Sequence, residues 1–114
     1  MQYLLLICSD KSAPPPQPAD MQPIVQGHMR VSKEISEAGK MVVSERLRPD
    51  TEGVRVRMKA GQRQVVDGPF TETKEALGGF YLIECVTKDE AVEWAKKLPL
   101  LEGGYVEVRP IWPM

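Results

Sequence analysis

Residues 65–75 read VVDGPFTETKE, and residues 78–83 read GGFYLI. The β-branched and aromatic ends of this stretch are typical of two strands, while Asp67, Gly68 and Pro69 are typical of a turn between them. The carboxylate of Asp67 is therefore expected at the end of a strand, where the glycine and the proline fix the backbone. A short charged segment at residues 72–75 leads from this turn into the second strand.

Hydrophobic periodicity outward from this stretch predicts the remaining elements. Residues 54–58 alternate between apolar side chains and arginine, so they are expected to form a hairpin with residues 64–66. Apolar spacings of four and three from Ile24 to Ala38, with His28 on the same face, predict a helix that starts near residues 20–23 and stops at Gly39. Further strands are expected at residues 3–8, 41–47, 79–86 and 105–109, and a second helix at residues 88–98.

The order of these elements, β-α-β-β-β-β-α-β, predicts an α+β fold with a ferredoxin-like split β-α-β plan and an extra central hairpin. The length of 114 residues suits a single domain, residues 1–114, with one modest core. Two helices can cover only one face of the sheet, yet residues 3–8 and 80–86 are apolar on both faces. The same face of a second copy is the simplest cover, so we expect a homodimer.

Composition excludes several classes of partner. The net charge is -1, the pI is about 5.9, and acids and bases are mixed along the chain, so no direct binding of nucleic acid is expected. The apolar run from Leu4 to Cys8 is too short for a signal peptide or a membrane span, which predicts a cytoplasmic protein without membrane contact. Cys8 and Cys85 fall at opposite ends of two antiparallel strands, so we expect both as unbridged, buried thiols.

Nearly the whole chain resembles the DGPF proteins, a branch of the YCII-related family. The matching segments are residues 1–7, 37–39, 67–75, 77–83, 91–95 and 106–112. The resemblance implies a dimeric α+β barrel, in which two ferredoxin-like units pack sheet to sheet around a cavity. Genes of this branch are often found beside genes for extracytoplasmic-function sigma factors, and no reaction is established for most members.

Two residues are candidates for acid/base chemistry. His28 is the only histidine, and it sits where YCII-like relatives carry a histidine proposed to work with an aspartate. An imidazole can titrate near neutral pH, but a structural histidine at the edge of the core fits the same position. Asp67 could bind or move a proton beside an apolar cavity, or it could simply cap its turn by accepting backbone hydrogen bonds.

Three further residues are candidates for ligand binding. Phe70 follows the turn, and Lys74 could approach Asp67 or an anionic ligand, although the charged segment also suits a solvated helical turn. Arg109 shares a strand face with Glu107 and is expected on the dimer side, where it would pair with an acid or clamp a ligand carboxylate. One histidine without a cysteine cluster cannot form an ordinary zinc site, so neither a metal nor a cofactor is expected.

Two functions of different classes fit these residues. The first is a cofactor-free enzyme that holds a small organic substrate in the barrel cavity and uses Asp67, and with it His28, as acid and base. The second is a noncatalytic module that senses a metabolite or binds a protein, linked to sigma-factor-associated regulation. The sequence does not name the ligand in either case.

Overall fold

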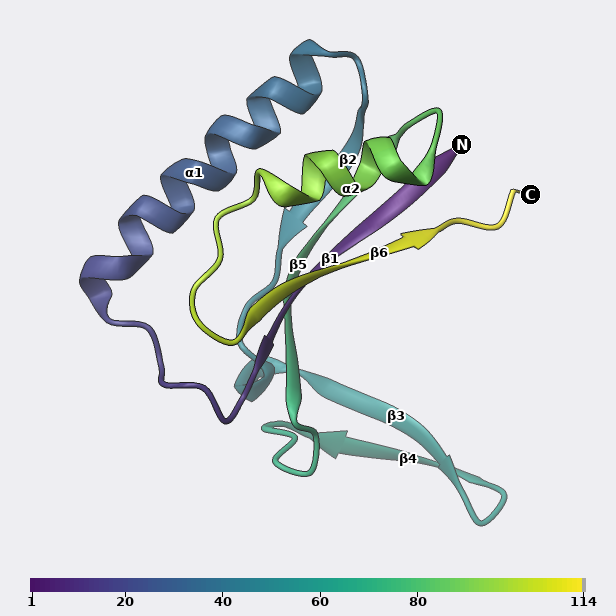
Figure 1. The fold of residues 1–114 in the computed structure, drawn as a ribbon. Coiled ribbons are helices and arrows are strands. Elements are labelled where there is room, and N and C mark those ends of the chain that lie inside the picture. The colour runs from purple at the N-terminus through teal and green to yellow at the C-terminus, as the bar shows by residue number, and fades with distance from the viewer. Residues whose placement is uncertain (114) are drawn as a thin grey trace.

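The computed structural model describes residues 1–113 and has two parts, a helix-covered sheet and a projecting hairpin (Figure 1). The sheet is antiparallel with strand order β2-β5-β1-β6, and the hairpin consists of β3 and β4. The elements are β1 (Gln2–Asp10), α1 (Pro18–Glu37), β2 (Met41–Arg46), the short 3₁₀ helix η1 (Asp50–Glu52), β3 (Val54–Lys59), β4 (Gln62–Asp67), β5 (Glu75–Glu84), α2 (Lys88–Lys96) and β6 (Gly104–Pro110). This order confirms the predicted α+β, ferredoxin-like plan with a central hairpin.

The starts of α1 and β5 differ most from the sequence prediction. α1 begins at Pro18, because Gln17 and Asp20 form a reciprocal capping box and the proline is tolerated in the first helical turn. β5 begins at Glu75 rather than at residue 79, because the backbone of residues 75–77 pairs with the end of β1. Of the charged segment at residues 72–75, only Glu75 belongs to β5, and a hydrogen bond of 3.2 Å from the Thr73 N–H to the Phe70 carbonyl closes a turn before it.

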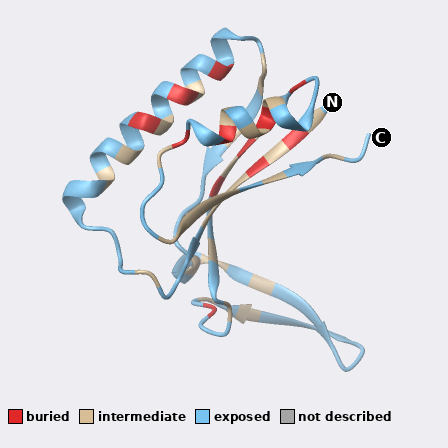
Figure 2. Cartoon of the chain, viewed as in Figure 1, coloured by how far each residue is buried: buried red, intermediate tan, exposed pale blue. Residues whose placement is uncertain are grey.

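The core lies between the sheet and the two helices (Figure 2). Leu5, Ile35 and Ile83, from β1, α1 and β5, are fully buried in it. Side chains alternate along a strand, so every second side chain of β1 and β5 points toward the helices. Leu5 and Tyr81 are paired in the register of these strands, and both point this way. Trp94 of α2 packs against this core and is partly buried.

The opposite face of the sheet is also apolar. Leu4 pairs with Leu82 and Leu6 pairs with Phe80, so their side chains form a half-buried patch on the face away from the core. Both helices pack on the core side of the sheet, so neither helix covers this opposite face (Figure 1). The sequence prediction of a two-faced apolar sheet is confirmed.

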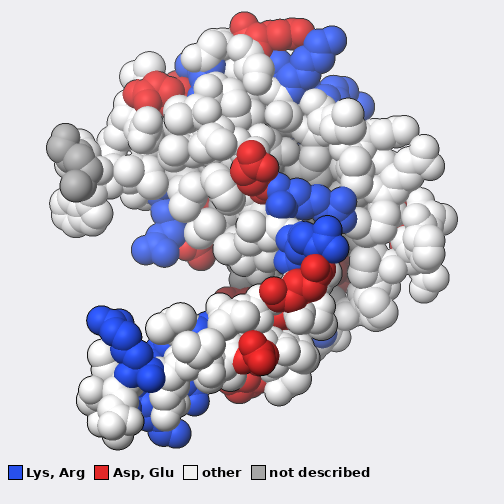
Figure 3. Space-filling model, turned by 180° about the vertical axis from the view of Figure 1, so that it is seen from behind, with Lys and Arg blue, Asp and Glu red and all other residues white. Residues whose placement is uncertain are grey.

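The hairpin forms an arm, defined as residues 54–67, with one apolar and one basic face. Val54, Val56, Met58 and Val65 lie on the apolar face and have exposed fractions of 56–70%. Arginine and lysine alternate with them along β3, so basic charge gathers at the outer end of the arm (Figure 3). Figure 3 shows a gap between this end of the arm and the rest of the described residues, and the apolar side chains of Val56 and Met58 are accordingly exposed.

Local signals of the sequence also hold. The Thr87 hydroxyl accepts a hydrogen bond from the backbone N–H of Glu90, as its position before α2 predicts. Glu90 in turn accepts from the backbone N–H of Val86. Cys8 and Cys85 lie at opposite ends of the β1–β5 pair, and both are free, which confirms the expectation that they are unbridged. Cys85 is buried as expected, whereas Cys8 is only partly buried.

Candidate functional site

A cleft of about 680 Å³ lies between α1 and the neighbouring strands β2 and β5. His28, Ser32 and Ser36 line it from α1, because residues four apart share one side of a helix. Ser44 and Arg46 line it from β2, where they are two residues apart and so share a strand face. Apolar side chains add hydrocarbon to the walls, from Met21, Ile24, Val25 and Met29 of α1 and from Ile7 of β1, and the charged residues Lys33 and Glu45 also border the cleft.

His28 and Tyr81 form a polar pair at this cleft. The Nδ1 atom of His28 lies 2.9 Å from the Tyr81 hydroxyl, and the two rings are stacked with centroids 6.0 Å apart. The same hydroxyl is 3.4 Å from the backbone oxygen of His28. Tyr81 comes from the middle of β5, and its ring is almost fully buried against the core.

The surroundings of His28 favour its neutral form. Burial lowers the pKa of the imidazole below its ordinary value of 6.5, and the positive charge of Arg46 lowers it further. A hydrogen bond with the backbone of Pro99 acts in the opposite direction. Burial also raises the pKa of the Tyr81 hydroxyl, so both members of the pair are neutral near pH 7.

Glycine makes room for the cleft. Gly79 falls in the same strand alternation as Tyr81, on the side of the sheet that faces α1, and both residues line the cleft. A Cβ atom at Gly79 would lie 2.8 Å from the backbone oxygen of Glu45 in β2. The glycine therefore lets the two strands approach and leaves the floor of the cleft without a side chain.

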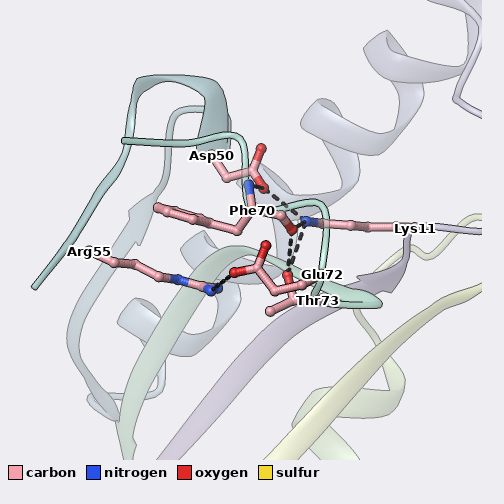
Figure 4. A network of polar contacts seen from close by, with 6 residues as sticks. All are labelled: Lys11, Asp50, Arg55, Phe70, Glu72 and Thr73. Carbon is pink, nitrogen blue, oxygen red and sulfur yellow. Dashed lines mark hydrogen bonds and ion pairs between the residues drawn. The ribbon is translucent and has the colours of Figure 1, made fainter. Parts of the chain in front are cut away.

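The segment after Asp67 forms a joint between the arm and the sheet, made by Lys11, Asp50, Arg55, Phe70, Glu72 and Thr73 (Figure 4). Lys11 is its centre: the Nζ atom donates to an Asp50 carboxylate oxygen at 2.9 Å, to the Phe70 carbonyl at 2.7 Å and to the Thr73 hydroxyl at 3.1 Å. This ammonium group also lowers the pKa of the Asp50 carboxyl.

Phe70 is buried in the joint, where the Arg55 guanidinium lies 3.8 Å from the centre of its ring. Arg55 also pairs with Glu72 at 3.1 Å. A second cavity of about 980 Å³ adjoins these residues, and both Phe70 and Arg55 line it. Phe70, which the sequence predicts to bind a ligand, is thus the buried apolar centre of the joint, and it also borders the second cavity.

Gly68 is needed where the joint meets η1. Its backbone N–H donates to the Gly53 carbonyl at 2.9 Å, and a Cβ atom in its place would lie 1.9 Å from the Asp50 carbonyl oxygen. The Gly68–Pro69 peptide bond is cis. The turn motif thus packs backbone against backbone at a distance that only glycine permits.

Asp67 is exposed at the end of β4, opposite Val54 in the hairpin register. Within residues 1–113 its carboxylate forms no hydrogen bond or ion pair, and it lines neither cavity. His28 instead lines the cleft between α1 and the strands β2 and β5. One chain therefore does not bring the two predicted acid/base residues into a common site.

The other predicted ligand-binding residues lie outside the cleft. Lys74 is exposed and contributes its backbone oxygen, which accepts a hydrogen bond from the Lys11 N–H at 2.8 Å. Arg109 lies beside Glu107 with a separation of 3.5 Å between their charged atoms, and both side chains are largely exposed.

Among residues 1–113 no group of three or more His, Cys, Asp or Glu is placed to hold a metal ion, and no helix is long and apolar enough to cross a membrane.

Sequence reasoning missed Tyr81, Arg46 and the serines of the cleft, and also Lys11 and Asp50 of the joint. These residues come from segments far apart in the chain, so no local motif connects them. A weak signal existed for the serines, because Ser32 and Ser36 follow His28 at intervals of four on a predicted helix.

The fold and the cleft together define a small α+β protein with a two-layer body and a projecting arm. The family model of the YCII-related domain matches residues 1–114, and the chain belongs to the YCII-related family. It is similar to an uncharacterized protein of Rhizobium meliloti (strain 1021), with 46% identity over 83 residues that cover 71% of this chain and 67% of that protein.

Proposed function

We propose that this protein binds a small organic molecule in the cleft beside α1 and that His28 acts there as an acid or a base. The observation that carries the proposal is the His28–Tyr81 pair, 2.9 Å apart, at the border of a cavity of about 680 Å³. Cavities of this size with a few convergent polar groups are typical of small-molecule sites. A single imidazole that is neutral near pH 7 is suited to accept a proton.

Tyr81 positions the proton on the imidazole. If the Tyr81 hydroxyl donates to Nδ1, the imidazole proton is on Nε2 and can be donated. If Nδ1–H donates to the hydroxyl oxygen instead, the hydroxyl proton can turn toward the His28 carbonyl and Nε2 carries a lone pair. The pair therefore offers both the acid and the base form of Nε2 without a change of charge.

A noncatalytic role is the second candidate, and the contacts of His28 favour it specifically. The Tyr81 hydroxyl occupies Nδ1, and the backbone of Pro99 lies close enough to raise the pKa of the imidazole, so the ring has partners within the folded chain. In this role the cleft would bind a metabolite and His28 would hold α1 against the sheet. The resemblance to DGPF proteins supports a link of such a sensor to sigma-factor-associated regulation.

We also propose a homodimer that covers the apolar outer face of the sheet. The half-buried patch around Leu6 and Phe80 supports it, because an apolar face of this kind is costly to leave in water. Leu6→Glu places a charge at the centre of the patch and should yield a folded monomer by light scattering. Wild-type protein that is monomeric at micromolar concentration would contradict the dimer.

A thermal-shift screen of small molecules tests the function. Ligands of the cleft should stabilise the wild type but not Ser32→Phe, which fills the cleft from α1. His28→Gln keeps an amide that can bond to Tyr81 but cannot titrate. A substrate that this variant binds normally but no longer converts supports catalysis, whereas binding without any conversion by the wild type supports the sensor. If Ser32→Phe responds to every ligand as the wild type does, the cleft is not the site.

A further inference from the structure

One wall of the cleft carries a cation without an acidic partner. Arg46 ends β2 and shares its strand face with Ser44, toward α1. In the described part of the chain no carboxylate forms an ion pair with Arg46, whereas Arg48, Arg55 and Arg109 each have one. Arg46 is therefore available to a ligand.

The remaining charges around the cleft do not cancel this one. Glu45 borders the cleft, but strand alternation directs its side chain to the opposite face from Ser44 and Arg46. Lys33 of α1 adds a second positive charge, because its one ion pair within residues 1–113, with Glu37, joins largely exposed side chains at 3.9 Å. Of the charged residues that line the cleft, Lys33 and Arg46 are positive and Glu45 is negative, so the lining carries one net positive charge.

The other walls suit the rest of an amphipathic molecule. Met29 is 67% exposed and Val25 is 36% exposed, so hydrocarbon surface of α1 faces the cavity without cover. Ser32 and Ser44 supply hydroxyl groups that can donate to an oxygen anion. An apolar wall opposite a cation and hydroxyl donors is the arrangement that recognises a carboxylic acid with a hydrocarbon body.

We propose that the cleft selects small carboxylic acids with an apolar body, whose carboxylate pairs with Arg46 and whose hydrocarbon part lies against Val25 and Met29. An arginine is suited to this task, since its planar guanidinium can donate two parallel hydrogen bonds to one carboxylate. This inference rests on the proposed small-molecule site and adds the chemical class of its ligand. It does not depend on whether His28 is catalytic.

Two probes of the same shape test the selection, 4-phenylbutyrate and the neutral 4-phenylbutanamide. Because His28 is the only histidine, its imidazole proton signals in NMR report on the cleft without further assignment. We expect the carboxylate to shift these signals and to bind about tenfold or more tightly than the amide. The variant Arg46→Gln should lose most of this preference and bind the carboxylate nearly as weakly as the amide.

Arg57→Gln is the matched control, because Arg57 lies on the arm and lines neither cavity, yet its loss changes the net charge equally. It should bind the carboxylate as the wild type does. Equal binding of both probes with shifted His28 signals, or an equal loss in the two arginine variants, would overturn the selection of carboxylates and leave the small-molecule site standing. If the thermal-shift screen yields no ligand and neither probe moves the His28 signals, the proposed function fails as well.

Discussion

Replacement of Phe70 by alanine should open the joint between the arm and the sheet. Phe70 is 7% exposed, and its ring lies between Arg55 and Gly53, the residue that follows η1. Truncation of a buried phenylalanine costs about 3–5 kcal/mol. Loss of the contact with the guanidinium adds about 0.5–1 kcal/mol, because Arg55 is partly exposed. We therefore expect the joint to lose about 4 kcal/mol.

The loss should be local. Phe70 is not part of the core cluster between the sheet and the helices, so the β1–β5 pair should keep most of its stability. Native-state hydrogen exchange measures this difference, because each amide reports the free energy of its own opening. The amide protons of Gly68 and Lys11, which donate across the joint, should exchange about a thousandfold faster, the equivalent of about 4 kcal/mol. Amides of Leu5 and its neighbours should change far less.

Phe70→Leu is the control for this experiment. It keeps most of the apolar volume but removes the aromatic ring, so it should cost only about 1–2 kcal/mol. A change below about 1 kcal/mol in the alanine variant would show that Phe70 does not hold the joint. An equal loss of protection along the β1–β5 pair would refute the separation of joint and core.

Three further predictions concern Gly68, His28 and Asp67. Gly68→Ala should cost about 2–4 kcal/mol in denaturant unfolding, because its Cβ would collide with the Asp50 carbonyl, whereas Gly78→Ala meets only the Ile7 carbonyl at an ordinary 3.7 Å and should be near neutral. The folded-state pKa of His28 is lowered, so its contribution to the free energy of unfolding is complete above pH 6.5 and is lost as the pH falls through the folded-state pKa. The free energy of unfolding should therefore decrease between pH 7 and 5, and His28→Gln should make this decrease smaller. An unchanged pH dependence in the variant would exclude the histidine as its source. Asp67→Asn should leave the denaturant midpoint unchanged, because the carboxylate is exposed and forms no hydrogen bond within residues 1–113; a tenfold loss of ligand binding or turnover would show that Asp67 reaches the ligand, whereas wild-type function would remove it from the candidates.

The chain's local patterns determined the elements and their order. The alternation of residues 54–58 specified the hairpin, and the apolar spacing from Ile24 onward specified the buried face of α1. The two-faced apolar pattern of β1 also indicated an outer sheet face without a helix over it. These features depend on contacts between near neighbours in the chain, where the periods of helix and strand fix which side chains share a face.

The candidate site was decided by tertiary structure. Sequence spacing placed His28 on an inward helical face, but only the packing of α1 over β5 brought its Nδ1 atom to the Tyr81 hydroxyl, 53 residues away. Tertiary packing also buries Phe70 in the joint and leaves Asp67 exposed to solvent. The reason is that the arm projects from the sheet at the point where Lys11 binds Asp50 and the Phe70 carbonyl. Hydrogen bonds and ion pairs between distant segments depend on how whole helices and strands pack against one another. A local sequence pattern does not predict this packing.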